Sequence, residues 1–227
     1  MVPLRVVARD FDAVLFDFGG VFTPSPFGAV EAFGTRLGAP PGRLLEITFG
    51  RYDADTDHPW HRLERGEITL LEARRAIREL AAEHALELDL FQVLRAMAGD
   101  GGAFIRESFV AAVRSLRSDG YRTALVTNNA AEFGASWRPL LPLTELFDAV
   151  VDSSEVGMRK PDPRIFHHAL EQLGGVTPAR AVFLDDYVGN VAAARRLGLQ
   201  GLVVGEPPEA ALEELARLLG RAPVAAP

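Results

Sequence analysis

The hydrophobic positions of the chain form two kinds of pattern that alternate along much of its length. Five short runs are apolar almost throughout, as in "AVLFDF" at residues 13–18. Runs of this kind predict strands that are covered on both faces of a sheet. The five runs span residues 13–18, 121–127, 147–152, 181–186 and 201–205.

A segment with helical spacing precedes each of the last four of these runs, and another follows the fifth. Alternation of strand and helix predicts an α/β fold with a parallel sheet and right-handed crossovers. In open sheets of this kind the ligand lies outside the carboxyl ends of the strands. The predicted helices span residues 106–118, 131–138, 163–173, 188–197 and 208–220.

One long stretch interrupts this rhythm with helical patterns and little strand signal. Its segment "TLLEARRAIRELAAEHAL" begins with a capping box, Thr69 with Glu72, and carries one apolar face. Because the stretch lies between the first two predicted strands, we expect an inserted helical cap above the carboxyl edge, with "AGDGGA" at 98–103 as the return hinge. The expected domains are a core of residues 1–23 and 102–227 and a helical cap of residues 24–101.

Composition narrows the class of protein. The chain has 227 residues, no cysteine and a net charge of -7, which argues weakly against a nucleic-acid partner. Its first residues lack the apolar core of a signal peptide, and no apolar run approaches the ~18 residues of a transmembrane helix. We expect a cytoplasmic protein that acts on a small molecule, as a monomer or homodimer, without a membrane partner.

Lysine usage singles out one position. Of 24 Lys plus Arg residues, only Lys160 is a lysine. A site that needs a compact ammonium rather than a guanidinium fork would keep a lysine. Composition alone leaves this interpretation and chance equally open, since one lysine must fall somewhere.

Polar residues gather at four predicted strand ends. Because ligands meet parallel sheets at this edge, these residues can converge in space despite their separation in sequence. The four groups are Asp17 after the first strand, Thr127 with Asn128 after the second, Lys160 after the third, and Asp185 with Asp186 and Asn190 after the fourth.

These side chains have complementary chemistry. The carboxylate of Asp17 can attack phosphorus or carbon and form a covalent intermediate, and Asp186 can bind a hard cation such as Mg²⁺. Lys160 can neutralise a phosphate, to which Thr127 and Asn128 offer hydrogen-bond donors. Phosphoryl transfer depends mainly on positioning and charge stabilisation, and this set of residues supplies both.

Four motifs carry a family resemblance over nearly the whole chain: "LFDFGGV", "LVTNN", "VGMRKPDPRIF" and "VFLDDYVGNVAAARRLG". In this order they resemble the haloacid dehalogenase superfamily, specifically its phosphatase-rich branch with a helical cap after strand one (subfamily IA). "GGVFTPSP" is similar to the phosphatase-like domains fused to epoxide hydrolases and to acyl-CoA dehydrogenases. The resemblance implies a Rossmann-like three-layer sandwich with an inserted cap, and Mg²⁺ as cofactor.

The resemblance also implies roles for individual residues. Asp17 would be the nucleophile and a Mg²⁺ ligand, with Asp186 and the carbonyl of Gly19 as further ligands. The phosphoryl group would be held by Thr127, Asn128 and Lys160, of which Thr127 and Lys160 also count as catalytic. Asp185 and Asn190 would orient the metal site and Lys160.

The sequence departs from the family pattern at Gly19. Most phosphatases of the superfamily have there a second Asp, which protonates the leaving oxygen and later activates water. A general acid–base contributes roughly 10²–10⁴ in rate, so its absence favours substrates with good leaving groups. Candidate substitutes are His58 and His61 from the cap, or a water near Asp185.

The cap contains further candidates. We interpret Trp60 and His61 as residues that shape the cap or contact the substrate, because loop aromatics often carry function. The acidic positions of "DADTDHPWHR" at 53–62 match no metal loop and predict a solvated segment. Arg159, beside Lys160, is expected to be a surface charge.

Three functions remain open. The leading hypothesis is a Mg²⁺-dependent phosphatase that acts through an aspartyl-phosphate on Asp17, on a small phosphorylated metabolite such as a sugar phosphate. A dehalogenase-type hydrolase of carbon–halogen bonds would also lack the second Asp, but it would not need the Asp185–Asp186 pair for a metal. A non-catalytic protein that binds phosphometabolites is the third hypothesis, since Gly19 replaces the acid–base residue.

Overall fold

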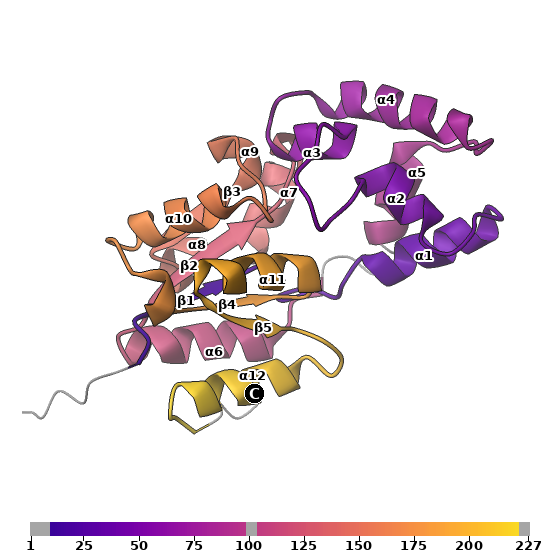
Figure 1. Ribbon diagram of the computed structural model, residues 1–227. Helices are drawn as coiled ribbons and strands as arrows, with labels where there is room; N and C mark the ends of the chain where they lie inside the picture. The colour runs from indigo at the N-terminus through magenta and orange to yellow at the C-terminus, as the bar shows by residue number, and fades with distance from the viewer. Residues whose placement is uncertain (1–9, 99–103, 223–227) are drawn as a thin grey trace, which may run out of the picture.

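The computed structural model describes residues 10–98 and 104–222. Its core is a parallel sheet with strand order β3-β2-β1-β4-β5, so the predicted parallel α/β fold is confirmed (Figure 1). Because β1 lies in the centre, the residue that follows it reaches the middle of the carboxyl edge. The strands are β1 (Ala13–Phe16), β2 (Arg122–Thr127), β3 (Ala149–Asp152), β4 (Ala181–Asp185) and β5 (Gln200–Val203).

Both faces of the sheet are covered, which explains why the strands are apolar throughout. Along β1, Val14 and Phe16 join one hydrophobic cluster, whereas Ala13 and Leu15 join the cluster on the opposite face. The first cluster includes residues of α6 (Glu107–Ser118) and α12 (Glu209–Leu218), and the second includes residues of α10 (Pro163–Gln172) and α11 (Val188–Leu197). The result is a Rossmann-like three-layer arrangement of helices, sheet and helices (Figure 1).

The helix expected over 131–138 is not continuous. It is divided into η1 (Ala131–Phe133), α7 (Gly134–Trp137) and η2 (Arg138–Leu140), and Pro139 lies in the last of these turns. Proline lacks the amide donor that a continuous helix requires, and glycine lowers helix propensity. The remaining short elements are α8 (Leu143–Leu146), α9 (Ser153–Val156) and η3 (Pro178–Arg180).

Five helices between β1 and α6 form the helical insert, which has a hydrophobic cluster of its own (Figure 1). The predicted capping box is present, since Thr69 and Glu72 each accept a backbone hydrogen bond from the other residue at the start of α4. The expected return hinge at 98–103 lies almost wholly outside the described residues. The five are α1 (Phe27–Arg36), α2 (Arg43–Phe49), α3 (Pro59–Glu64), α4 (Leu70–Glu83) and α5 (Leu90–Ala98).

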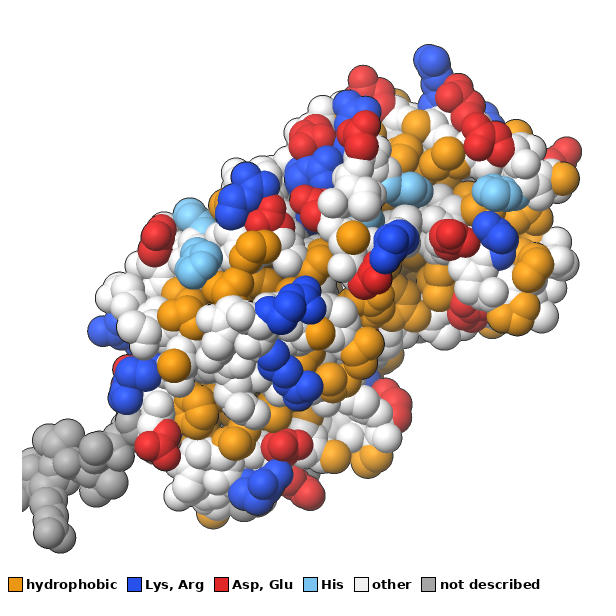
Figure 2. All heavy atoms as spheres, viewed as in Figure 1, with side chains coloured by type: hydrophobic (Ala, Val, Ile, Leu, Met, Phe, Trp, Pro, Cys, Tyr) orange, Lys and Arg blue, Asp and Glu red, His pale blue; other side chains and the backbone are white. Residues whose placement is uncertain are grey.

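The insert lies beyond the carboxyl ends of the strands, beside the core (Figure 1). On the face shown in Figure 2, hydrophobic side chains are visible where the insert meets the core. Among residues 10–98 and 104–222, no helix combines the length and the apolar character needed to cross a membrane.

Candidate active site

A cavity of about 260 Å³ separates the carboxyl ends of the strands from the helical insert. Asp17, Thr127, Lys160 and Asp186 line its core side, although they come from four distant parts of the sequence. The parallel sheet accounts for this convergence, because β1, β2 and β4 all end at the same edge.

Lys160 lies between two carboxylates at the floor of this cavity. Its Nζ atom is 2.7 Å from Oδ1 of Asp17 and 2.7 Å from Oδ2 of Asp185. Asn190 donates to Asp185 Oδ2 at 3.0 Å, and the Tyr187 amide donates to Asp185 Oδ1 at 2.8 Å. Asp185 therefore contacts the ammonium directly, and Asn190 contacts Asp185.

Lys160 is fully buried, which gives a physical reason for a lysine, rather than an arginine, at this position. Burial by itself lowers the pKa of Lys160, but the charges of Asp17 and Asp185 outweigh it and raise the pKa above its ordinary value. The side chain remains a permanent cation beside Asp17, in a space that a compact ammonium fills.

Asn128 acts on the backbone of this lysine. Its Oδ1 accepts from the Lys160 amide at 2.8 Å, and its Nδ2 donates to the Lys160 carbonyl at 2.9 Å. These hydrogen bonds position Lys160; Asn128 also lines the cavity, and its contact with a phosphoryl oxygen stays a prediction. Thr127 is 2% exposed and lines the cavity at the end of β2, where we predicted a phosphate donor.

Three carboxylates crowd one side of the cavity. Asp17, Asp185 and Asp186 can each offer an oxygen such that these atoms lie within 4.8 Å of one another. Burial, opposed by Lys160 and reinforced by the two other carboxylates, raises the pKa of Asp17 to about 8. Burial and the charge of Asp185 likewise raise the pKa of Asp186 to about 6. One ammonium does not balance this group of acids, so a further cation fits beside Asp17 and Asp186.

The two glycines after Asp17 differ in their surroundings. A Cβ atom on Gly20, whose φ is +71°, would lie 2.0 Å from Cγ of Asp186, so this position requires glycine. A Cβ atom on Gly19 would meet nothing within 4 Å. The place of the usual acid–base residue is thus open space rather than space filled by another group.

Neither candidate histidine takes that place, because among the described residues the cavity lining contains no histidine. His58 caps α3, where its Nδ1 accepts from the Trp60 amide at 3.1 Å. His61 is fully buried and accepts from the Thr56 amide at 3.0 Å. Burial, with the nearby charge of Arg159, lowers the pKa of His61 to about 3. The expected substrate contact of His61 is therefore corrected to packing within the insert, whereas Trp60 does line the cavity.

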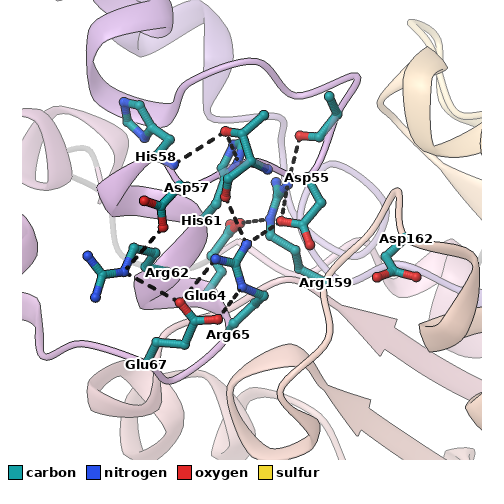
Figure 3. Close-up of polar contacts among 12 residues, drawn as sticks. Asp55, Asp57, His58, His61, Arg62, Glu64, Arg65, Glu67, Arg159 and Asp162 are labelled. Carbon is teal, nitrogen blue, oxygen red and sulfur yellow. Dashed lines mark hydrogen bonds and ion pairs between the residues drawn. The ribbon is translucent and has the colours of Figure 1, made fainter.

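Arg159 is not a surface charge, which corrects the expectation from sequence. Its side chain is fully buried, and its Nε donates to Oε2 of Glu64 in α3 at 2.7 Å (Figure 3). Its Nη1 donates to the carbonyl of Ala54 at 3.2 Å and lies 3.7 Å from Oδ1 of Asp55. Arg159 therefore connects the loop that contains Lys160 to the helical insert.

The acidic segment at 53–57 is only partly solvated. The side chain of Asp57 is 93% exposed, but that of Asp55 is 19% exposed and pairs with Arg65 as well as Arg159 (Figure 3). The expectation of a wholly solvated loop was wrong for Asp55. Part of the reason is tertiary, because the partner Arg159 is 104 positions later in the chain, whereas the partner Arg65 is only 10 positions later.

Sequence reasoning missed most residues of the outer cavity wall. Phe27, Tyr52 and Glu64 line the cavity from the insert, and Tyr187 lines it from the core. Tyr52 packs against Phe27 and Tyr187 with ring centroids 5.1 Å and 5.2 Å apart. The aromatic content of residues 27–60 was the only signal in the sequence that could have indicated this wall.

The chain is similar to curated proteins of which it covers very different shares. It is 34% identical to mouse acyl-CoA dehydrogenase family member 10 over 93% of this chain and 19% of that protein. It is 29% identical to mouse bifunctional epoxide hydrolase 2, over 96% of this chain and 39% of that protein. It is 28% identical to sesquiterpene phosphatase astK of Aspergillus oryzae, over 85% of this chain and 89% of that protein. The chain thus spans about a fifth to two fifths of the first two relatives.

A solved structure shares the fold. It is a haloacid dehalogenase family enzyme from Bacteroides thetaiotaomicron in complex with magnesium and inorganic phosphate, with a TM-score of 0.57 and 22% identity over 86% of this chain and 94% of that one. The family sequence model described as haloacid dehalogenase-like hydrolase matches residues 11–198. The motifs at the strand ends, the fold and this match agree, and the chain belongs to the haloacid dehalogenase-like hydrolases.

Proposed function

We propose that this hydrolase is a Mg²⁺-dependent phosphatase that acts on a small phosphate monoester through Asp17. The observation that carries the proposal is the group of three carboxylates, Asp17, Asp185 and Asp186, around a single ammonium. Asp185 is occupied by Lys160, Asn190 and the amide of Tyr187, which leaves Asp17 and Asp186 for a cation.

The residues at the strand ends suggest the roles in such a reaction. An oxygen of Asp17 attacks phosphorus, the bond from phosphorus to the leaving oxygen breaks, and water then hydrolyses the aspartyl-phosphate. Lys160 opposes the negative charge of the phosphoryl group, and the Thr127 hydroxyl donates to one of its oxygens. Mg²⁺ held by Asp17, Asp186 and the Gly19 carbonyl would supply further positive charge to the phosphoryl oxygens.

The comparisons support the same reaction class. Several relatives are named phosphatases, and one structural neighbour contains magnesium with inorganic phosphate, whereas another is named a dehalogenase. None of them identifies the substrate of this chain. Because the chain spans a fraction of its first two relatives, the activity of any larger protein is a separate question.

The test is phosphate release from a panel of phosphate esters with Mg²⁺ or with EDTA. We expect Mg²⁺-dependent turnover that Asp17→Asn reduces by at least ~10³-fold, because the nucleophile is lost. Asp57→Asn, at a side chain 93% exposed, is the matched control and should retain full activity. Turnover by Asp17→Asn at the wild-type rate would contradict the mechanism. Chloride release from 2-chloropropionate that EDTA does not affect would favour the dehalogenase alternative.

A further inference from the structure

The wall of the cavity that faces away from the strand ends is aromatic. Tyr52 is its centre, with ring centroids 5.1 Å from Phe27 and 5.2 Å from Tyr187. A cavity wall of this kind binds flat apolar groups by burial and ring contacts rather than by hydrogen bonds. Besides Phe18, the aromatic residues that line the cavity are Phe27, Tyr52, Trp60, Phe133, Trp137 and Tyr187.

The charges of the cavity disfavour a substrate with a second anionic group. Among the described residues that line the cavity, Lys160 is the only cation, and it already contacts Asp17 and Asp185. The remaining charge on the insert side is Glu64, whose carboxylate accepts from the buried Arg159. A carboxylate or second phosphate on the substrate would therefore face acids and rings, without a partner for its charge.

The size of the cavity suits one ring with its phosphate. An engineered apolar cavity of about 150 Å³ binds benzene. The present cavity of about 260 Å³ leaves room for a phosphoryl group beside a ring of that size. A sugar of similar size would bury hydroxyls against the ring of Phe27, which offers no hydrogen-bond partner.

The open space at Gly19 points to the same chemistry. Without an acid at that position, the leaving oxygen departs with its electron pair and without a proton. A phenol, with a pKa near ~10 like that of tyrosine, leaves as a stable phenolate, whereas a sugar alkoxide does not. The phenolate takes its proton from water afterwards, so one ester and one water give one phenol and one phosphate.

From these observations we propose that the substrate is a phosphate monoester of an uncharged phenol. This inference rests on the proposed phosphatase function and narrows it, in place of the sugar phosphate expected from sequence. The aromatic wall holds the leaving group, and the strand ends hold the phosphoryl group.

Binding of non-hydrolysable phosphonates tests the wall separately from turnover. Phenylphosphonate, methylphosphonate and phosphonoacetate present the same phosphoryl group with a ring, a methyl group or a carboxylate. In the presence of Mg²⁺ we expect calorimetry to give phenylphosphonate a Kd about tenfold lower than methylphosphonate, because each aromatic contact is worth roughly two- to tenfold. We expect phosphonoacetate to bind more weakly than both.

A variant of the wall makes the test specific. Phe27→Gln should raise the Kd of phenylphosphonate by roughly two- to tenfold and leave that of methylphosphonate unchanged. Phe104→Gln, at a phenylalanine 66% exposed, is the control and should change neither value. Phe133→Gln provides a second variant if Phe27→Gln does not fold.

Two results would overturn the inference. One is equal or weaker binding of phenylphosphonate than of methylphosphonate by the wild-type protein. The other is tighter binding of phosphonoacetate than of phenylphosphonate. If Mg²⁺-dependent phosphate release persists in either case, the proposed phosphatase function stands and only the substrate class is wrong. Loss of Mg²⁺-dependent release from every ester would instead overturn the function.

Discussion

The two sides of the cavity are built from different chemistry and from different parts of the chain. The core side presents buried charges at strand ends, among them Asp17 and Lys160, which are held 2.7 Å apart. The insert side presents rings such as those of Phe27 and Tyr52, whose centroids lie 5.1 Å apart. In the reaction that we propose, the charged side holds the phosphoryl group that all substrates share, and the aromatic side distinguishes one leaving group from another.

The two sides also differ in how substitutions should act. Changes on the charged side alter turnover for every substrate, because they affect the reacting atoms. Changes on the aromatic side alter the preference among substrates. Arg159 joins the two, since its backbone lies beside Lys160 and its side chain binds Glu64.

Adding the missing acid gives the largest expected effect. Gly19→Asp places a carboxyl group in space where a Cβ atom meets nothing within 4 Å. We expect about 10²–10⁴-fold faster hydrolysis of alkyl phosphates, whose leaving oxygen needs a proton, and little change for p-nitrophenyl phosphate. Gly19→Ala is the control and should change neither rate. An equal gain for both esters in steady-state kinetics would show that the added carboxyl group does not act as an acid.

Removing the ion pair of Arg159 with Glu64, which links the core to the insert, should mainly lower the free energy of unfolding. Arg159→Met leaves the carboxylate of Glu64, 3% exposed, buried without its partner, at a cost of about 3–5 kcal/mol. Urea unfolding measures this loss, and the double variant Arg159→Met with Glu64→Gln should recover most of it. The control is Arg75→Met in the exposed pair with Glu79, where we expect about 0.3–0.5 kcal/mol. A loss at Arg159 no larger than this control would contradict a structural link.

Alanine substitution should have opposite outcomes at the adjacent glycines Gly19 and Gly20. Gly20→Ala puts a Cβ atom 2.0 Å from Asp186 Cγ at a φ of +71°, so the metal-side carboxylate must move. A displacement of about 1 Å at a catalytic group can cost about 10²-fold in rate. We expect a loss of this size in kcat for every phosphate ester, with Gly19→Ala at the wild-type rate. Full activity of Gly20→Ala would show that Asp186 does not need its described position.

The pH dependence of Mg²⁺ binding gives a smaller effect. Without a metal, the pKa values of Asp17 and Asp186 are raised to about 8 and about 6. Because raised carboxyl pKa values mean that the folded protein holds protons that the unfolded chain releases, stability without metal should fall as pH rises from about 4 to 8.

Mg²⁺ competes with those protons, so its stabilisation should grow over the same range. At a hundredfold excess over Kd it adds about 2.7 kcal/mol, which is roughly 5–10 °C in Tm for a chain of this size. Thermal unfolding at pH 5.5 and pH 8.5, with and without Mg²⁺, measures the difference. An increase in Tm by Mg²⁺ that is larger at pH 5.5 than at pH 8.5 would contradict this prediction. Asp17→Asn is the control and should show a reduced shift at both pH values.

The sequence was sufficient for the core because its signals are local. Strands covered on both faces must be apolar at every position, and Ala13–Phe16 shows this without any partner being known. The capping box at Thr69 is also local, and it is confirmed. Strand ends meet at one edge of a parallel sheet, so the grouping of Asp17 with Lys160 followed from topology.

Long-range partners could not be inferred in the same way. Arg159 lies in a polar motif, and no local pattern indicates that Glu64, 95 positions earlier, removes it from solvent. Asn128 offered an amide that suits either a phosphate or a backbone, and only the structure shows both ends engaged with Lys160. His61 had the chemistry of an acid, but its burial within the insert lowers its pKa to about 3.

The sequence by itself determined the parallel sheet, the order of the motifs and the polar residues at the strand ends, because periodicity and strand ends are properties of neighbouring residues. Only the tertiary structure decided what faces those groups. The packing of the insert on the core brings Phe27 and Tyr52 opposite Asp17, buries Arg159, and leaves the position beside Gly19 open. These features depend on contacts between residues tens of positions apart, which folding alone brings together.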